Sequence, residues 1–249
     1  MILKDLHVHT DFSDGKNSIE ETVLCAIEKG MNVLGISDHS YTAFDESYCM
    51  KKEKIPEYIS TVNALKHKYR GKIELLCGIE QDYYSSEDTS AFDYVIGSVH
   101  YLYKNGEYFP VDESEDICKA AIIKHYGGDG LSLAEDYFDT VSKVVDKTNA
   151  DIIGHFDLVS KFNINGALFD ESDRRYISAW QKAADILISK NVPFEINTKR
   201  VLPLGTEPYP KKEIIDYIIK NGGRFVLSSD SHKSSDLCSA FCKYGQFVK

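Results

Sequence analysis

The sequence lacks the segments that mark membrane-spanning and secreted proteins. No apolar run in its 249 residues approaches the roughly 20 residues that a transmembrane helix needs. The first residues, MILKDLHVHT, do not combine a basic region with an apolar stretch, so we expect no signal peptide. These absences predict a cytoplasmic protein that does not act at a membrane.

Cysteine pairs, repeats and linkers are also missing. The six cysteines contain no CxxC spacing, which argues against a local cysteine-rich zinc site. Cys238 and Cys242 are spaced to share one helical face, and we interpret them as small buried apolar residues. Without a linker or low-complexity tract, residues 1–249 are expected to form a single domain.

Positive charge is in the minority. The chain has 29 Lys and Arg against 39 Asp and Glu, a formal net charge of −10. Such a balance argues against loose attraction to nucleic acid or to an anionic membrane. It does not exclude a phosphate substrate, because local charge decides that question. Divalent cations held by a few carboxylates would make an anion-attracting site inside an acidic protein.

Short apolar runs typical of β-strands alternate with amphipathic helical patterns along the whole chain. We expect strands at residues 2–9, 33–38, 73–82, 94–102, 151–156, 193–197 and 224–230. We expect helices at residues 18–30, 54–70, 115–126, 133–149, 173–190, 211–221 and 235–243. The longest expected loops are 40–52 and 103–115. Seven β/α units in a row predict a closed or nearly closed α/β barrel, with its active site at the C-terminal strand ends.

Histidines and acidic residues stand at the ends of six of these seven strands. The segments are LHVHT, ISDH, GIE, GSVH, IGHFD and SSDSH, which contain His7, His9, Asp38, His39, Glu80, His100, His155, Asp230 and His232. Imidazole and carboxylate together are ligands of Zn, Fe(II) and Mn(II). A large mixed set predicts several ions with open positions for water and substrate. The other two histidines, His67 and His125, lie in helical patterns and are not assigned to the site.

The ordered motifs resemble the polymerase and histidinol phosphatase (PHP) superfamily. They are HxH followed by an SDG-containing loop, then SDH, GIE, GSVH, GHFD and SDSH, and they run from His7 to His232. Within the superfamily, the chain looks most like the L-histidinol phosphate phosphatases of histidine biosynthesis. The resemblance implies a distorted (β/α)7 TIM-like barrel over residues 1–249, holding two or three divalent metal ions (Zn, Mn or Fe).

The resemblance also implies which residues hold each ion. The first ion would be held by His7, His9, Glu80 and Asp230. The second would share Glu80 and be held by His100 and His155. The third would be held by Asp14, His39 and His232, although some members have a histidine where Asp14 stands. Asp38 is expected to support the site, either by orienting an imidazole or by accepting backbone N–H groups.

The implied activity is hydrolysis of L-histidinol phosphate to L-histidinol and phosphate, by attack of a metal-bridging hydroxide. Lys161 and Arg200 are expected above the barrel mouth as a phosphate clamp, with Lys199 as the competitor for Arg200. Asp230 and His232 are the candidates for assisting the leaving group. Contacts with histidinol are expected from acidic and aromatic residues of 41–48 and 101–115: Tyr41, Phe44, Asp45, Glu46, Tyr103, Phe109, Asp112, Glu113 and Glu115.

Three alternatives stay open at this point. The first is a PHP-type phosphoesterase that acts on a phosphotyrosine protein, a nucleotide or DNA ends. The second is a metal-dependent amidohydrolase, although no strand-end lysine matches the carboxylated lysine of those enzymes. The third is a non-catalytic metal-binding module, which would have filled coordination spheres. The sequence specifies neither the metal nor an oligomeric state.

Overall fold

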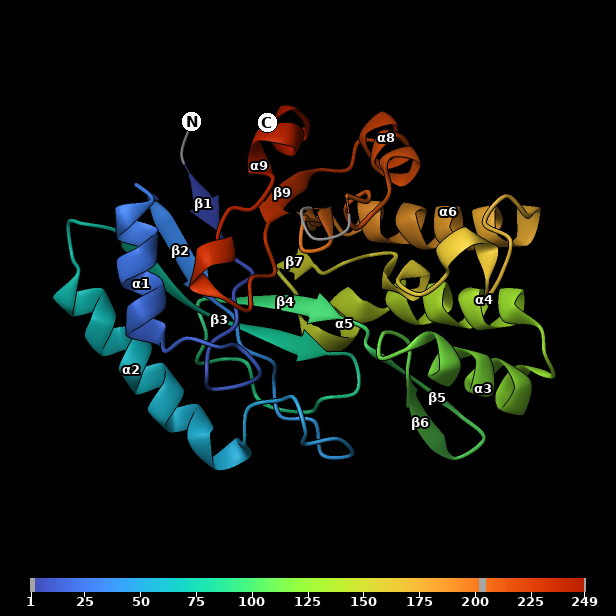
Figure 1. Cartoon of the computed structure of the whole chain (residues 1–249), viewed down its shortest axis with the longest axis horizontal. Coiled ribbons are helices and arrows are strands. Elements are labelled where there is room, and N and C mark those ends of the chain that lie inside the picture. Colours follow the sequence, from blue (N-terminus) through green and yellow to red (C-terminus); the bar gives the residue numbers. More distant parts are fainter. Residues whose placement is uncertain (1–2, 202–204, 249) are drawn as a thin grey trace.

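A seven-stranded parallel sheet forms the centre of the molecule (Figure 1). The computed structural model describes residues 3–201 and 205–248, so residue 2 of the first expected strand lies outside the described residues. The strands, in their order across the sheet, are β1 (Lys4–Asp5), β2 (Val33–Ile36), β3 (Glu74–Asp82), β4 (Tyr94–Ser98), β7 (Ile152–Ile153), β8 (Phe194–Asn197) and β9 (Phe225–Ser228). Each of them falls at an expected strand, and neighbouring strands pair in parallel.

The first and last strands of the sheet meet at their C-terminal ends. Val8 and Ser231, just beyond β1 and β9, form a parallel bridge. The amide of His9 donates to the Ser231 carbonyl at 2.9 Å, and the amide of Ser231 donates to the His7 carbonyl at 3.2 Å. The predicted barrel is therefore confirmed as a nearly closed seven-stranded barrel, distorted because β1 and β7 are each only two residues long.

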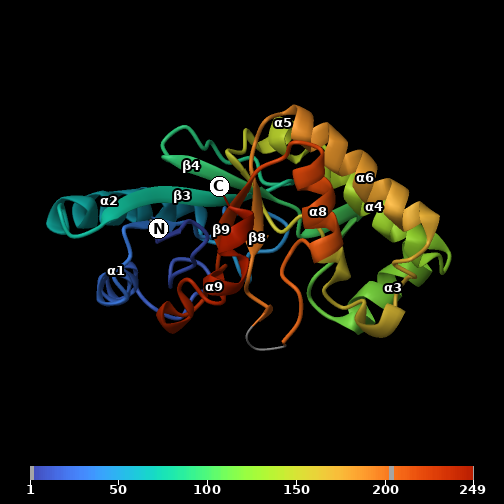
Figure 2. The ribbon, with the colours of Figure 1, turned by 90° about the horizontal axis from the view of Figure 1, so that it is seen from above.

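Helices flank the sheet on its outer faces (Figures 1 and 2). They are α1 (Ile19–Glu28), α2 (Ile55–Lys68), α3 (Glu115–Tyr126), α4 (Gly130–Val141), α5 (Val144–Thr148), α6 (Arg174–Ser189), α8 (Lys212–Lys220) and α9 (Phe241–Tyr244). In α6 the buried side chains follow one stripe of the helix, including Tyr176, Trp180 and Leu187. Burial of such stripes against the sheet holds the strand ends in place. Within the described ranges, no helix is long and apolar enough to cross a membrane.

Two expected helices differ from the structure. The expected helix 133–149 is interrupted between α4 and α5, where the Ser142 hydroxyl donates to the Asp139 carbonyl at 2.7 Å. The expected helix 235–243 is wrong, because a short 3-10 turn at Ser234–Asp236 and the short α9 stand there in place of one continuous helix. Cys238 and Ala240 each have a φ of 58°, a left-handed conformation that a continuing helix does not contain. Cys242 is exposed, so the shared buried face predicted for the two cysteines does not exist.

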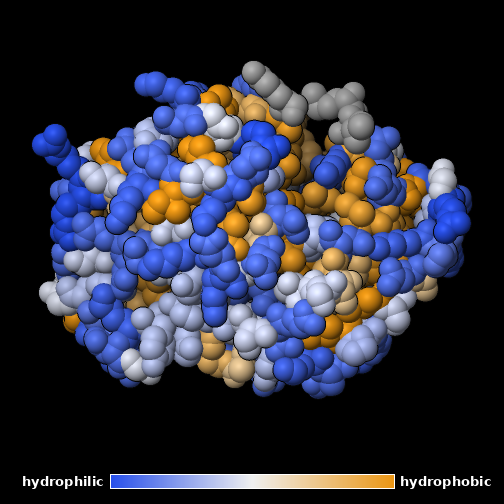
Figure 3. Space-filling view, turned by 180° about the vertical axis from the view of Figure 1, so that it is seen from behind, coloured by the Kyte–Doolittle hydropathy of each residue, from blue (hydrophilic) through white to orange (hydrophobic). Residues whose placement is uncertain are grey.

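The expected loop 103–115 contains a β-hairpin. Its strands are β5 (Tyr101–Lys104) and β6 (Glu107–Pro110), which pair antiparallel. Asn105 and Gly106 connect them with φ values of 54° and 87°, the positive values that a two-residue hairpin turn requires. The hairpin begins directly after His100 and returns the chain to the barrel mouth at Pro110. The face of the molecule opposite to that in Figure 1 carries mostly hydrophilic side chains with apolar ones between them (Figure 3).

Candidate metal centre

Side chains from the strand ends converge at the C-terminal mouth of the barrel. The structure brings together all nine predicted ligands: His7, His9, Asp14, His39, Glu80, His100, His155, Asp230 and His232. Seven are buried, whereas the side chains of Asp14 and His232 are 32% and 21% exposed and line the cavity. His67 and His125 lie elsewhere: His67 is exposed, and His125 stacks on Phe109 with 4.8 Å between the rings.

The innermost group has the atom spacing that a single metal ion requires. Glu80 Oε2 lies 3.3 Å from His7 Nε2 and 3.6 Å from His9 Nε2. Asp230 Oδ1 lies 3.3 Å from His9 Nε2 and 4.0 Å from His7 Nε2. Ligand atoms 2.0–2.1 Å from a tetrahedral ion stand roughly 3.3–3.4 Å apart. His7, His9 and Asp230 therefore surround one ion-sized position, and Glu80 lies beside both imidazoles.

Glu80 joins this group to a second one. Its other oxygen, Oε1, lies 3.0 Å from His155 Nε2 and 3.4 Å from His100 Nε2. The Glu80 carboxylate thus has imidazole nitrogens on both sides, as a carboxylate shared by two ions requires. His39 Nδ1 lies 2.7 Å from Glu80 Oε2, and His39 Nε2 lies 3.7 Å from Asp14 Oδ1. His39 therefore contacts both Glu80 and Asp14.

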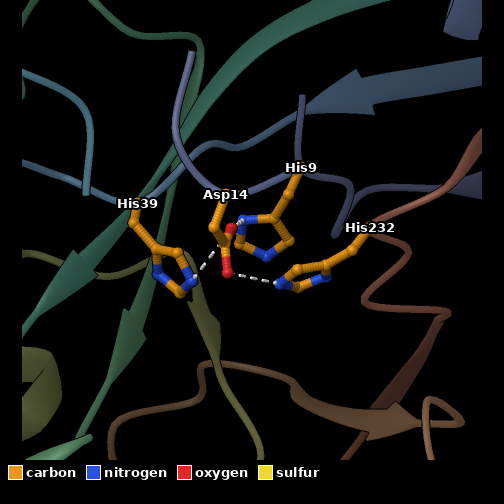
Figure 4. A group of neighbouring side chains, drawn as sticks. All are labelled: His9, Asp14, His39 and His232. Carbon is orange, nitrogen blue, oxygen red and sulfur yellow. Dashed lines mark ion pairs between the residues drawn. The ribbon is translucent and has the colours of Figure 1, made fainter. Parts of the chain in front are cut away.

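The outer group surrounds Asp14 (Figure 4). Asp14 Oδ2 lies 3.0 Å from His232 Nε2, and Oδ1 lies 3.7 Å from His39 Nε2 and 3.8 Å from His9 Nδ1. Burial raises the pKa of Asp14, but the hydrogen bond with His232 and the nearby imidazoles of His39 and His9 outweigh burial and hold that pKa well below its usual value. The structure adds His9 to the three residues expected at this position.

Unpaired buried atoms test whether these residues suit a metal. His7 Nε2, both ring nitrogens of His9 and Glu80 Oε2 have no hydrogen-bond partner within the described part of the chain. Leaving a buried polar atom unpaired costs about 1–3 kcal/mol. Divalent ions would satisfy these atoms, and the mixture of imidazole nitrogen and carboxylate oxygen suits Zn, Mn and Fe(II). The residues therefore fit the ions predicted from the sequence.

Glu195, in β8, supports the innermost group and was missed by the sequence analysis. Its Oε2 lies 2.8 Å from His7 Nδ1, and its Oε1 accepts hydrogen bonds from the His155 amide at 2.6 Å and from Asn197 Nδ2 at 3.0 Å. A carboxylate on Nδ1 fixes the proton there and leaves His7 Nε2 free for a metal. The available signal was a charged residue inside an apolar strand that is buried on both faces.

Two aspartates support other parts of the predicted ligand set. Asp82 Oδ2 accepts a hydrogen bond from the His100 amide at 3.0 Å and lies 3.2 Å from His100 Nδ1. Asp38 accepts from the Thr10 amide and hydroxyl, both at 2.7 Å, and from the Ser13 hydroxyl at 2.5 Å. The prediction that Asp38 supports the site by accepting a backbone N–H group is therefore confirmed. Asp38 holds the loop that carries Asp14.

A cavity of about 1090 Å³ opens above the metal centre, and its lining includes four cationic side chains: Lys161, Lys199, Arg200 and Lys211. Lys199 Nζ donates to Asp230 Oδ1 at 3.1 Å and lies 3.2 Å from His232 Nε2. Arg200 donates from Nε to the Glu207 carbonyl at 2.6 Å, and its guanidinium lies 4.0 Å from the centre of the Tyr209 ring. Lys161 pairs with Asp112 at 3.0 Å. Of these cations, Lys199 has the shortest contact with the metal centre.

Part of the cavity wall is aromatic and acidic. Tyr48 and Tyr101 stack with 6.1 Å between their rings, and Tyr48 also lies edge-on to the His39 ring at 4.9 Å. Of the residues expected to contact histidinol, the carboxylates of Asp45, Asp112 and Glu113 line the cavity. The expectation for Phe109 was wrong, because its ring is buried against His125.

Comparisons with known proteins place the chain in a family. The model of the PHP domain matches residues 5–199, most of the chain. This chain belongs to the PHP domain family. Asp230 and His232 lie beyond the matched segment, so their place in the centre rests on the geometry described above.

Several relatives are similar over most of the chain, from 74% to 94% of its length. The probable histidinol-phosphatase of Deinococcus radiodurans is 28% identical over 250 residues, covering 94% of this chain and 88% of that protein. The histidinol-phosphatase of Lactococcus lactis is 28% identical over 251 residues, covering 92% and 83%. The DNA polymerase/3'-5' exonuclease PolX of Bacillus subtilis is 24% identical over 198 residues, but the match covers only 33% of that protein.

Two crystal structures share the fold. The putative histidinol phosphatase of Listeria monocytogenes superimposes with a TM-score of 0.83 and 23% identity, covering 97% of this chain and 99% of that one. The histidinol phosphate phosphatase of Lactococcus lactis, complexed with Zn, L-histidinol and phosphate, superimposes with a TM-score of 0.73 and 20% identity, covering 99% and 92%. At these identities the likeness establishes a common barrel fold.

Proposed function

We propose that this protein hydrolyses L-histidinol phosphate to L-histidinol and phosphate with two or three divalent ions in the metal centre. The observation that carries the proposal is the Glu80 carboxylate, which lies between two sets of imidazoles beneath a cavity lined by cations. Full-length relatives with the name histidinol-phosphatase support the choice of substrate. A cytoplasmic location stays a prediction of the sequence.

We assign the ligands as three overlapping sets. His7, His9, Glu80 and Asp230 would hold one ion; Glu80, His100 and His155 a second; and Asp14, His39 and His232, with His9, a third. Zn, Mn and Fe(II) all suit this mixture of ligands. Ions bound there supply a hydroxide nucleophile near neutral pH and offset the negative charge of the phosphate.

The cations at the barrel mouth bind and orient the phosphate dianion. The Arg200 guanidinium is anchored by the carbonyls of Glu207 and Pro208 and by the Tyr209 ring, so little side-chain freedom is lost when it binds an anion. Lys161 is held over the cavity by Asp112. Fixing the phosphate in line with the leaving oxygen is the main contribution that positioned charges make to phosphoryl transfer.

Asp230 and His232 are the groups that assist departure of the alkoxide. Burial raises the pKa of Asp230, but Lys199 and His7 outweigh burial and hold that pKa far below its usual value. The Asp230 carboxylate therefore stays ionised and acts by accepting hydrogen bonds. We assign proton donation to His232, whose partly exposed ring lines the cavity.

The aromatic and acidic wall recognises the histidinol part of the substrate. Histidinol carries an imidazole ring and an ammonium group, which suit a stacked aromatic surface and a carboxylate respectively. Tyr48 and Tyr101 provide the aromatic surface. We assign the ammonium group to Asp112, because its carboxylate lines the cavity beside the phosphate-binding Lys161.

The test compares phosphate release from L-histidinol phosphate, phosphotyrosine and a dinucleotide by the metal-reconstituted protein. We expect kcat/KM to favour L-histidinol phosphate by roughly 100-fold, because the other substrates leave buried polar groups of the wall unpaired. A preference for phosphotyrosine or the dinucleotide would replace histidinol as the substrate. An inactive protein with its metals bound would support the non-catalytic module instead.

A further inference from the structure

Lys199 has an unusual position for a lysine beside a metal centre. Among the residues that the structure describes, it is the only Lys or Arg whose side chain forms a hydrogen bond with a predicted metal ligand. Its Nζ lies 3.1 Å from Asp230 Oδ1 and 3.2 Å from His232 Nε2. Asp230 belongs to the innermost group and His232 to the outer one. The ammonium therefore stands between the two groups, on atoms that an ion would use.

The outer group is the one that this positive charge affects most. Its ligands are three imidazoles and one carboxylate, Asp14, so it provides one negative charge for a divalent ion. The innermost group has both Glu80 and Asp230. A neighbouring ammonium cancels the charge that Asp14 provides and occupies the nitrogen of His232. An ion at the outer position must displace Lys199 from that nitrogen.

Displacement needs only the side chain to move. The backbone is anchored, because the Lys199 amide donates to Asn197 Oδ1 at 3.1 Å and the Thr198 hydroxyl donates to the Ser239 carbonyl at 2.6 Å. The Lys199 side chain is 43% exposed and lines the cavity, so its long stem has room to turn toward the substrate. The released ammonium would then face the bound phosphate.

We propose that Lys199 is a resident counter-cation of the outer metal position, which competes with the third ion and lowers the number of ions bound at limiting metal. The inference rests on the proposed metal centre. Only at the third position does a lysine compete with the ion. The third ion binds weakly, and its arrival releases a lysine into the cavity.

The decisive experiment counts bound ions in Lys199→Met, which keeps the apolar stem and removes the charge. The wild type and the variant are dialysed against buffered Zn²⁺ over a range of free concentrations, and bound zinc is measured by mass spectrometry. We expect the weakest ion of the variant to bind roughly 10–100-fold more tightly, the range over which neighbours of ligands change metal affinity. The tighter ions should change little.

Arg200→Met is the matched control, because it removes an adjacent cation whose hydrogen bonds go to loop carbonyls rather than to ligands. We expect its zinc isotherm to follow the wild type. An unchanged isotherm in Lys199→Met would overturn the proposal. So would an equal tightening in Arg200→Met, since the effect would then be one of general charge.

A second measurement does not depend on folding of the variant. Amine-reactive labelling of Lys199 in the wild-type protein is followed by mass spectrometry without zinc and with saturating zinc. We expect faster labelling of Lys199 with zinc. Equal labelling rates would contradict the displacement of Lys199 by the third ion. Neither measurement needs turnover. If no ion binds, the metal centre itself is wrong; if ions bind but L-histidinol phosphate is not cleaved, only the substrate is wrong.

Discussion

His7 and Glu195 form a buried pair in which the imidazole Nδ1 lies 2.8 Å from the carboxylate Oε2. Both side chains are fully buried. Burial raises the pKa of Glu195, but His7 outweighs burial and lowers that pKa below its usual value, so the carboxylate is ionised. An ionised carboxylate on Nδ1 makes His7 a better ligand through Nε2 and holds its ring in one orientation.

Glu195→Gln should lower metal affinity about 10–100-fold. Oε1 of Glu195 accepts from the His155 amide, and Oε2 accepts from the Ser228 hydroxyl at 2.5 Å and faces His7 Nδ1. A glutamine side chain has one oxygen and one NH₂ group. In either orientation, the NH₂ group therefore faces a group that donates to Glu195 in the wild type, the His155 amide or the Ser228 hydroxyl. Competition with a chelator of known affinity measures the loss. Glu213→Gln, at an exposed site in α8, is the control, and equal affinity in both variants would contradict the role of Glu195.

Gly15→Ala should displace the loop that carries Asp14. A Cβ atom at Gly15 would lie 2.5 Å from the His9 carbonyl and from the Thr10 nitrogen, and backbone atoms cannot give way at so short a distance. We expect a loss of stability of about 1–3 kcal/mol and loss of the weakest ion. Urea unfolding and ion counting measure the two effects. The neighbouring, exposed Lys16→Ala should behave as the wild type. An alanine variant with normal ion content would show that the close approach does not matter.

Asp112→Asn should distinguish recognition of the ammonium group from recognition of the phosphate. We expect KM for L-histidinol phosphate to rise about 10-fold or more, because a hydrogen bond to a charged group is lost. KM for phenyl phosphate should stay constant or fall, since Lys161 loses its partner and becomes available to phosphate. Glu115→Gln, where Glu115 pairs with Lys119 on α3, is the control. Equal increases for both substrates would assign Asp112 to the phosphate clamp instead.

Asp157→Asn should stabilise the metal-free protein at high pH. Asp157 is fully buried, with Oδ2 accepting from the Lys211 amide and Oδ1 unpaired within the described residues. Burial raises the pKa of Asp157 from 3.8 to about 6, although Arg200 and Lys211 partly oppose the effect. The folded state therefore holds this proton more tightly than the unfolded state. As a result, stability falls as the pH rises through this range and then stays constant above it.

The pKa difference corresponds to a cost on the order of 3 kcal/mol above pH 7. Asparagine avoids this cost, so the variant should be more stable than the wild type at pH 8. The difference should almost disappear near pH 3, which is below the pKa of Asp157 in both states. Urea unfolding at the two pH values measures it, with the exposed Asp216→Asn as the control. An equal gain at both pH values would mean that charge is not the cause.

The barrel and the convergence of its ligands could be predicted, because parallel strands place their C-terminal ends at one mouth. A histidine at a strand end, such as His155, therefore has its location fixed by the fold class. Its role as a ligand stays a prediction. Glu195 was missed because a strand buried on both faces shows no alternation that would direct its side chain inward.

Lys199 and the C-terminal segment could not be predicted from the sequence, for a different reason. Strand β8 ends at Asn197, so alternation could not decide whether Lys199 or Arg200 turns toward the metal centre. The structure turns Lys199 inward and ties Arg200 to loop carbonyls. The helix expected at 235–243 failed because Cys238 and Ala240 adopt left-handed conformations, for which neither side chain has a preference.

The bridge between Val8 and Ser231 also sets the order in which the centre can be assembled. His7 and His9 leave the ribosome first, whereas Asp230, which faces them across the closed barrel, leaves more than 200 residues later. A growing chain therefore holds His7, His9 and Glu80 long before Asp230 completes the innermost group. We therefore expect the complete innermost group to form only when the ends of β1 and β9 come together.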